Sequence, residues 1–214
     1  MFNWIQKAAL ALTLCVGLGA HAADTPPDEL LKQVTDEVVT LIKTDHDLQV
    51  GDRQKAFAVV DGKIAPHFDF VRMTRLALGK NWAKATPEQQ TQVVEAFRSL
   101  LVHTYSSALT RFRNQQFTYK PWTGNAADQT TTVQSVVSDG SHNTPVDYAM
   151  ARADGTWKVY DIKVEGISLV TNYRSDFNDR IVAGGIDGLI KDLQDKARAA
   201  ETAKPGDVKS PRKS

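Results

Sequence analysis

Hydrophobic periodicity changes twice along this sequence, and these changes limit the folds that the chain can adopt. Between residues 29 and 112, apolar side chains recur every three or four positions, which is typical of amphipathic helices that bury one face. Between residues 116 and 164, apolar and polar residues alternate, and Thr, Val, Tyr and Trp are frequent, as in β-strands. Helical spacing returns between residues 169 and 200. Because helices and strands are segregated along the sequence, we predict an α+β fold.

The strongest helix signal begins at Thr86. This residue is suited to the N-cap, Pro87 to the first helical position, and Gln89 to the position that completes a capping box. The apolar stripe that follows continues to Phe112, so we expect this helix to be the spine of the domain. Five further helices, which make about six in all, are predicted at residues 29–44, 53–64, 68–78, 169–182 and 186–200. Gly184–Gly188 predicts a tight turn between the last two.

Four strands are predicted in the middle of the chain, at residues 116–122, 129–138, 145–153 and 156–164. The last two are separated only by Asp154-Gly155, which is a strong hairpin signal. We therefore expect a twisted, four-stranded, mainly antiparallel sheet.

The last predicted strand carries apolar residues on both faces. Strict alternation places Trp157 and Val159 on one face. Tyr160, Ile162 and Val164 then point to the other face. Such a strand must be covered by protein on both sides, or must face something apolar that is not protein.

The first 22 residues have the parts of a secretory signal peptide. The basic residue Lys7 precedes an apolar run from Ala8 to Ala20, and the segment closes on the small-x-small motif Ala20-His21-Ala22. Because the run is too short to cross a bilayer, cleavage near Ala22 is favoured over the alternative, a membrane anchor. We expect residues 1–22 to be removed and the mature chain to be secreted.

Cysteine content and tail composition complete the predicted organisation. Cys15 is the one cysteine of the sequence, and the large Leu14 before it argues against attachment of a lipid. The mature chain is therefore expected to contain no disulfide. We predict one domain at residues 23–200, followed at residues 201–214 by a disordered basic tail that has no aromatic residue.

Catalytic and metal-binding signals are weak. The formal net charge of +1 argues against a nucleic-acid partner, which would need a concentrated basic face. The histidines expected in the mature chain, His46, His67, His103 and His142, are not at metal-ligand spacing. Asp161 and Glu165 could form an acid/base pair, but a structural, hydrogen-bonded role is favoured. We predict no metal, no cofactor and no enzymatic activity. The apolar stripes fit either a filled core or a lined pocket, because periodicity does not separate the two.

Several stretches carry a resemblance to a known family: Pro66–Phe70, Met73–Trp82, Ala85–Gln90, Phe97–Leu101, Tyr160–Val170 and Gly185–Leu189. In order and spacing, and together with the signal peptide, they resemble the MlaC family, also called the toluene-tolerance or organic-solvent-resistance auxiliary family. The resemblance extends over nearly the whole mature chain, to about Ala200.

The resemblance implies a phospholipid carrier in the periplasm of Gram-negative bacteria. Such a protein holds both acyl tails of a glycerophospholipid in an apolar cavity between helices and sheet, with the head group near solvent. It shuttles the lipid between an outer-membrane lipoprotein complex and an inner-membrane ABC transporter with an MCE-domain subunit, and so maintains outer-membrane lipid asymmetry. A monomer suits a diffusing shuttle.

Apolar residues on the predicted helices and strands would then line the lipid cavity: Phe70, Leu78, Trp82, Phe97, Leu101, Tyr105, Leu109, Tyr148, Met150, Tyr160, Ile162, Val164, Ile167, Val170 and Tyr173. Two alternatives stay open. One is a periplasmic enzyme on a similar scaffold, for which Asp161 with Tyr160 or His103 would be the candidate group. The other is an adaptor with a filled core and no ligand.

Overall fold

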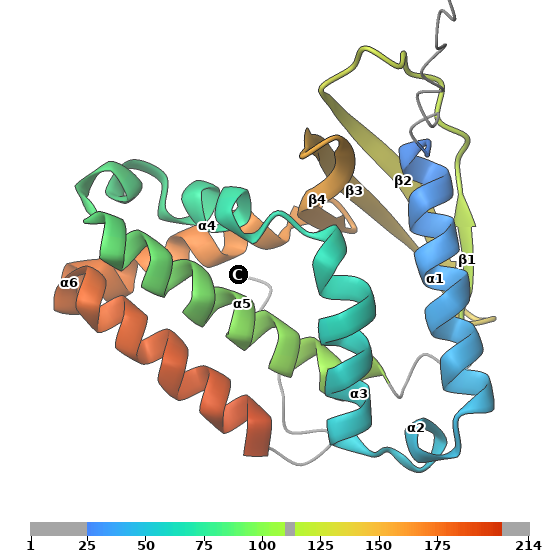
Figure 1. Ribbon diagram of the computed structural model, residues 1–214, viewed down its shortest axis with the longest axis horizontal. Helices are drawn as coiled ribbons and strands as arrows, with labels where there is room; N and C mark the ends of the chain where they lie inside the picture. The colour runs from blue at the N-terminus through green and yellow to red at the C-terminus, as the bar shows by residue number, and fades with distance from the viewer. Residues whose placement is uncertain (1–24, 110–113, 203–214) are drawn as a thin grey trace, which may run out of the picture.

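The computed structural model describes residues 25–109 and 114–202, and it places a group of helices beside an antiparallel sheet (Figure 1). The prediction of an α+β fold is confirmed. The predicted signal peptide, the end of the predicted spine helix at Phe112 and residues 203–214 of the predicted tail lie outside the described residues. In chain order the helical elements are α1 (Pro27–Thr44), α2 (His46–Val50), α3 (Arg53–Val59), η1 (Val60–Ile64), η2 (Ala65–His67), α4 (Phe70–Leu78), η3 (Gly79–Lys84), α5 (Pro87–Leu109) and α6 (Leu169–Thr202). Within the described ranges, no helix combines the length and apolarity needed to cross a membrane.

The sheet is a meander in which each strand pairs antiparallel with the next. Its strands are β1 (Gln116–Tyr119), β2 (Thr130–Ser138), β3 (Asn143–Ala153), β4 (Thr156–Val164) and β5 (Ile167–Ser168). The four predicted strands are present, but the predicted number is too small by one. The additional strand, β5, folds back onto the end of β4 through Glu165 and Gly166, which both have positive φ angles. Two residues are too few to show alternation, so the sequence pattern gave no sign of this strand.

A β-bulge at Tyr160 interrupts the pairing of β3 with β4. Val159 lies opposite Met150. The next paired residue on β4 is Asp161, which lies opposite Ala149, so Tyr160 is an extra residue in the ladder. A one-residue shift exchanges the faces to which all later side chains point.

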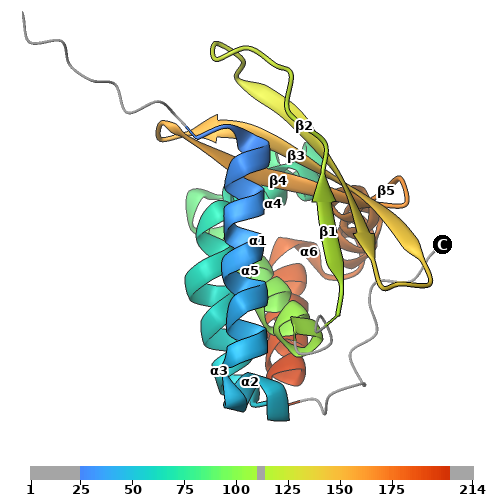
Figure 2. The same cartoon turned by 90° about the vertical axis from the view of Figure 1, so that its right-hand side faces the viewer.

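The predicted orientation of the last strand is wrong because of this bulge. Ile162 and Val164 lie on the same face as Val159, and not on the opposite one. Residues of α1 pack on this face, as Figure 2 shows for the helix as a whole. Tyr160 packs instead against the apolar residues of the helices.

Local capping explains where the helices begin. The capping box predicted for α5 is confirmed: the amide of Gln89 donates to the hydroxyl of Thr86 at 3.2 Å, and the amide of Thr86 donates to Oε1 of Gln89 at 3.1 Å. The helix α4 begins at Phe70, two residues later than predicted. The reason is that Phe68 forms a bridge with β4, while the carboxylate of Asp69 accepts the amide of Arg72 at 2.8 Å and so caps the helix.

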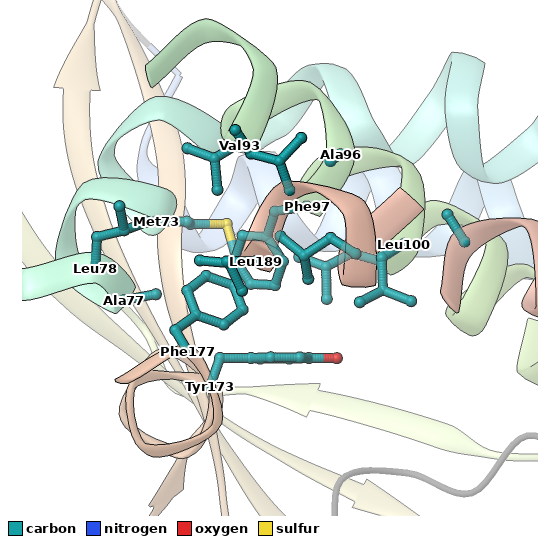
Figure 3. Packing of buried hydrophobic residues seen from close by; sticks show 14 of the residues in the cluster. Met73, Ala77, Leu78, Val93, Ala96, Phe97, Leu100, Tyr173, Phe177 and Leu189 are labelled. Carbon is teal, nitrogen blue, oxygen red and sulfur yellow. The ribbon is translucent and has the colours of Figure 1, made fainter. Parts of the chain in front are cut away.

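The core of the helical part lies between α4, α5 and α6 (Figure 3). Phe97 of α5 is completely buried, and its ring meets the edges of two aromatic rings of α6. The ring centroids are 4.8 Å apart for Tyr173 and 5.0 Å apart for Phe177. Such edge-to-face contacts add to the stabilisation that comes from apolar burial.

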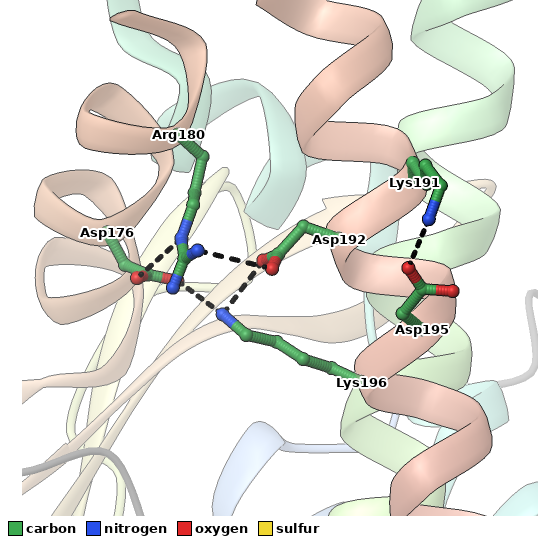
Figure 4. Close-up of polar contacts among 6 residues, drawn as sticks. All are labelled: Asp176, Arg180, Lys191, Asp192, Asp195 and Lys196. Carbon is green, nitrogen blue, oxygen red and sulfur yellow. Dashed lines mark hydrogen bonds and ion pairs between the residues drawn. The ribbon is translucent and has the colours of Figure 1, made fainter. Parts of the chain in front are cut away.

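The helix α6 bends sharply at Gly185, whose φ and ψ angles are 69° and −172°. The predicted turn at Gly184–Gly188 is confirmed in this form, and it lets the C-terminal half of α6 run alongside α5 (Figure 1). Ion pairs join the two halves across the bend (Figure 4). Lys196 contacts Asp176 at 3.0 Å and Asp192 at 2.9 Å. Arg180 contacts the same two carboxylates at 3.5 Å and 3.4 Å.

Gly185→Ala should destabilise the protein by about 1–3 kcal/mol, because its backbone angles fall in a region that is open essentially to glycine alone. A Cβ atom at this position would meet no other atom within 4 Å, so the effect comes from the backbone and not from a steric clash. Urea denaturation measures the change. Gly184→Ala is the matched control, since position 184 is equally open and has no positive φ angle. Equal stability of the two variants would contradict this explanation of the bend.

Candidate functional site

The buried apolar residues form three clusters instead of one continuous core. The helical cluster lies between α4, α5 and α6; the N-terminal cluster joins α1, α2, α3 and η1 to the end of α5; and the sheet cluster lies between the start of α1 and strands β2 to β4. Two partly buried rings connect them. Phe68 packs against the helical and sheet clusters, and Phe70 against the helical and N-terminal clusters. Their centroids are 5.9 Å apart.

The residues predicted to line a cavity are distributed over all three clusters. The helical cluster contains Leu78, Phe97, Leu101, Val170 and Tyr173, with Phe70, Trp82 and Tyr160 packed against it. The N-terminal cluster contains Leu109, and the sheet cluster contains Met150 with Tyr148 and Ile162 against it. Three others, Tyr105, Val164 and Ile167, are accessible, with exposed fractions of 37%, 45% and 48%. Phe97 and Met150 are inaccessible and pack as ordinary core.

Tyr105 combines accessibility with a buried environment. Although 37% of its surface is exposed, burial raises the pKa of its phenol. The remaining surface of the side chain is covered by protein atoms.

Tyr105 belongs to a group of four tyrosines on helices and sheet, here called the tyrosine group: Tyr105 on α5, Tyr173 on α6, Tyr119 on β1 and Tyr148 on β3. Burial is the main cause that raises the pKa of each phenol. Proximity to Tyr105 raises the pKa of Tyr173 further. The rings of Tyr119 and Tyr148 lie 6.2 Å apart. In Figure 3 the hydroxyl of Tyr173 extends past the phenylalanine rings of the helical cluster.

The helix α1 is joined to the sheet beside these tyrosines. The hydroxyls of Thr35 and Tyr119 are 2.6 Å apart and share a hydrogen bond. Nearer the start of α1, the carboxylate of Asp28 accepts the backbone amide of Trp122 at 2.9 Å. The arrangement places α1, β1 and β3 around one aromatic surface.

Three residues that belong to this apolar surface are not among the predicted site residues: Phe68, Tyr119 and Trp122. Phe117 and Tyr119 are aromatic residues at alternate positions of a predicted strand, and this pattern could have identified Tyr119. Trp122, at the end of the same predicted strand, does not follow that alternation. Phe68 gave no such signal, because it lies just before a helix, and only its bridge to Val159 of β4 brings it to the sheet.

Asp161 has a structural role at the junction of sheet and helix. Its carboxylate accepts hydrogen bonds from the hydroxyl of Ser168 at 2.6 Å and from the amide of Val170 at 3.0 Å. The same hydroxyl accepts the amide of Thr171 at 3.0 Å, so two side chains together cap the start of α6. Among the described residues, no cluster of His, Cys, Asp and Glu is arranged to hold a metal ion.

The tyrosine group predicts a loss of stability at alkaline pH. A phenol whose pKa is raised by folding contributes stability that is fully present below about pH 10, its unfolded pKa, and is lost as the pH rises further. For Tyr119 and Tyr173 the slope should approach about 1.4 kcal/mol per pH unit each. Urea denaturation between pH 9 and pH 12 (roughly the range around that pKa) measures it. The Tyr173→Phe variant should show a shallower slope than the parent, and an unchanged slope would contradict the assignment.

The helices and the antiparallel meander define the class of the protein as an α+β domain with apolar clusters on both its helices and its sheet. Comparison with known proteins identifies the class more closely. The family model described as "MlaC protein" matches residues 32–195. The chain therefore belongs to the MlaC family, as the sequence motifs predict.

Three relatives illustrate this membership. The chain is 25% identical over 214 residues to toluene tolerance protein ttg2D of Pseudomonas putida, and the match covers 100% of this chain and 99% of the relative. It is 21% identical over 199 residues to the intermembrane phospholipid transport system binding protein MlaC of Haemophilus influenzae, covering 91% of this chain and 93% of the other. A phospholipid-binding protein from Ralstonia solanacearum, solved in complex with a phospholipid, is 40% identical with a TM-score of 0.73. That similarity covers 80% of this chain and 96% of the solved one.

Proposed function

We propose that this protein binds a glycerophospholipid by its acyl tails and carries it through the periplasm. The observation that carries the proposal is the similarity to the Ralstonia protein, which was solved with a phospholipid and is 40% identical to this chain. The accessible side chains of Tyr105, Val164 and Ile167 support it, because they offer uncovered apolar surface. The signal peptide predicted at residues 1–22 agrees with the same compartment.

The physical need for such a carrier follows from the cost of exposing acyl tails. Two tails contain about thirty methylenes, and each costs roughly 0.8 kcal/mol in water, so an unescorted lipid faces a barrier on the order of 20 kcal/mol. A dry apolar site removes most of that barrier. The tails gain little over a bilayer, however, so the carrier contributes a path through water and does not set the direction of transport.

Direction must then come from proteins that bind the loaded and empty forms with different affinity. We propose an outer-membrane lipoprotein complex at one end and an inner-membrane ABC transporter with an MCE-domain subunit at the other. The residues proposed to contact the tails first are the accessible members of the predicted set, Tyr105, Val164 and Ile167, together with Tyr148 and Tyr173 of the tyrosine group.

Native mass spectrometry of the purified mature protein tests the proposal. We expect a bound mass equal to that of a diacyl phospholipid, with one lipid per chain. A chain that stays bare after incubation with phospholipid vesicles would favour an adaptor without a ligand. If the protein converted the bound lipid to a product, and Asp161→Ala abolished this conversion, the result would favour an enzyme.

A further inference from the structure

A second candidate site lies where α4, η3 and the start of α6 meet. It is an open pocket of about 690 Å³. Three arginines line it: Arg72 and Arg75 from α4, and Arg174 from α6. None of the three is among the site residues predicted from the sequence or among the proposed lipid contacts. We refer to this site as the arginine pocket.

Two of the three arginines are held in position by contacts that do not neutralise them. The guanidinium carbon of Arg72 lies 3.9 Å from the centroid of the Tyr160 ring. Nε of Arg174 donates to the carbonyl oxygen of Leu76 at 3.0 Å. No ion pair joins Arg72, Arg75 or Arg174 to an acidic residue in the described part of the chain.

Arginines elsewhere in the helical part do have acidic partners. Arg98 of α5 contacts Asp61 at 2.5 Å, and Arg180, less than two turns after Arg174 on α6, contacts Asp176 and Asp192. The arginines of the pocket differ from these two in having no acidic partner among the described residues. Three arginine side chains without acidic partners therefore surround one pocket. Their positive charge favours the binding of an anion from outside the protein.

Acidic groups within the pocket do not balance this charge. Asp69 lines the pocket, but its Oδ1 atom accepts the amide of Arg72 as the cap of α4. Two exposed lysines of η3, Lys80 and Lys84, add further positive charge beside the pocket. Three guanidinium groups thus share the site with one carboxylate that is already engaged.

The shape and lining of the pocket indicate the kind of anion. A guanidinium with one face against an aromatic ring keeps its N–H edges available, and their fork geometry matches a carboxylate or a phosphate. Trp82 also lines the pocket, and Val71 at its edge is 56% exposed. Arginine and tryptophan in a pocket beside an exposed aliphatic residue are typical of the anchor points of protein interfaces. A concave site with apolar walls suits an inserted side chain better than the flat plane of lipid phosphates.

We propose that the arginine pocket docks an acidic segment of a partner protein. Asp or Glu side chains of the segment pair with Arg72, Arg75 and Arg174, and an apolar neighbour packs against Trp82 and Val71. This inference rests on the proposed function, because a lipid carrier must engage the proteins that deliver and receive its lipid.

Binding of a labelled peptide to the full mature protein tests the inference. The probe is a short fluorescein-labelled peptide of Asp and Glu around one Leu, and its amide analogue of Asn and Gln is the uncharged comparison. Fluorescence anisotropy gives the Kd. Arg75→Glu is the test variant, because the described residues form no hydrogen bond or ion pair with the Arg75 side chain. Lys163→Glu on β4 makes the same change of charge at an exposed position elsewhere. We expect Arg75→Glu to weaken peptide binding by about tenfold or more, and Lys163→Glu by less than about twofold.

The outcomes separate this site from the lipid site. Equal weakening by both variants, or equal binding of the uncharged peptide, would overturn the inference. Arg75-dependent binding to vesicles containing phosphatidylglycerol, with no binding of the peptide, would overturn it in favour of a membrane contact. Native mass spectrometry should show the same phospholipid per folded molecule in Arg75→Glu as in the parent, and a loss would assign the pocket to the lipid site. Absence of lipid from every variant would contradict the proposed function alone, because the peptide measurement does not depend on it.

Discussion

Phe97→Ala should lower the free energy of unfolding by about 3–5 kcal/mol, because it removes a large, completely buried ring from the helical cluster. The ring contacts Tyr173 and Phe177 edge to face, and both of these side chains are anchored on α6. The cavity left by the substitution cannot collapse without moving α6 against α5. A loss of this size is a large fraction of the stability of an ordinary domain.

Urea denaturation measures this effect, and Val182→Ala on α6 is its control. Val182 is 79% exposed, so its truncation should change the free energy of unfolding by no more than about 0.5 kcal/mol. If Phe97→Ala cost less than about 1 kcal/mol, the helical cluster would have to be loosely packed, contrary to the contacts described above.

Tyr105→Glu should reduce bound phospholipid per folded molecule by at least about tenfold, which corresponds to about 1.4 kcal/mol. The burial that raises the pKa of the Tyr105 phenol also disfavours a carboxylate placed against acyl tails. Because Tyr105 is 37% exposed, the carboxylate can reach water when no lipid is bound, so folding should be affected less than lipid retention. Native mass spectrometry gives the ratio of loaded to bare chains.

Two further variants serve as controls for Tyr105→Glu. Tyr105→Phe keeps the ring and removes the hydroxyl, so it should retain lipid at the level of the parent. Val182→Glu introduces the same charge at an exposed position of α6 and should retain lipid as well. Full lipid occupancy of folded Tyr105→Glu would show that this side chain does not line the lipid site.

The parts of the fold that depend on local chemistry could be predicted from the sequence. The capping box of Thr86 and Gln89 and the turn at Gly185 are set by neighbouring residues, and both are present. The bulge at Tyr160 could not be predicted in the same way. Both faces of β4 carry apolar residues, so the alternation reads equally well in either register, and only the pairing with β3 selects one. The strand β5 could not be predicted either, because two residues are too few to show an alternating pattern.

The candidate sites, like the fold, have parts that the sequence predicts and parts that depend on tertiary contacts. Motifs along the sequence predicted the family, and the family match over residues 32–195 agrees with them. Helical spacing placed Tyr105 on an apolar stripe but could not reveal that 37% of its surface is exposed, because exposure depends on how the other elements pack. In the arginine pocket, the side chain of Arg174 donates a hydrogen bond to the backbone of Leu76, which is 98 positions away in the sequence. No pattern of sequence spacing predicts a contact between residues so far apart.

The bulge makes Tyr160 a position that β4 could lose without changing the direction in which its later side chains point. If Tyr160 were deleted, Asp161 would follow Val159 directly and still lie opposite Ala149, and Ile162 would stay opposite Tyr148, beneath α1. The carboxylate of Asp161 should then keep its hydrogen bonds to the hydroxyl of Ser168 and the amide of Val170. The deletion would remove only the ring that packs against the helical cluster, so this ring is an addition to the sheet and not a part of its alternation.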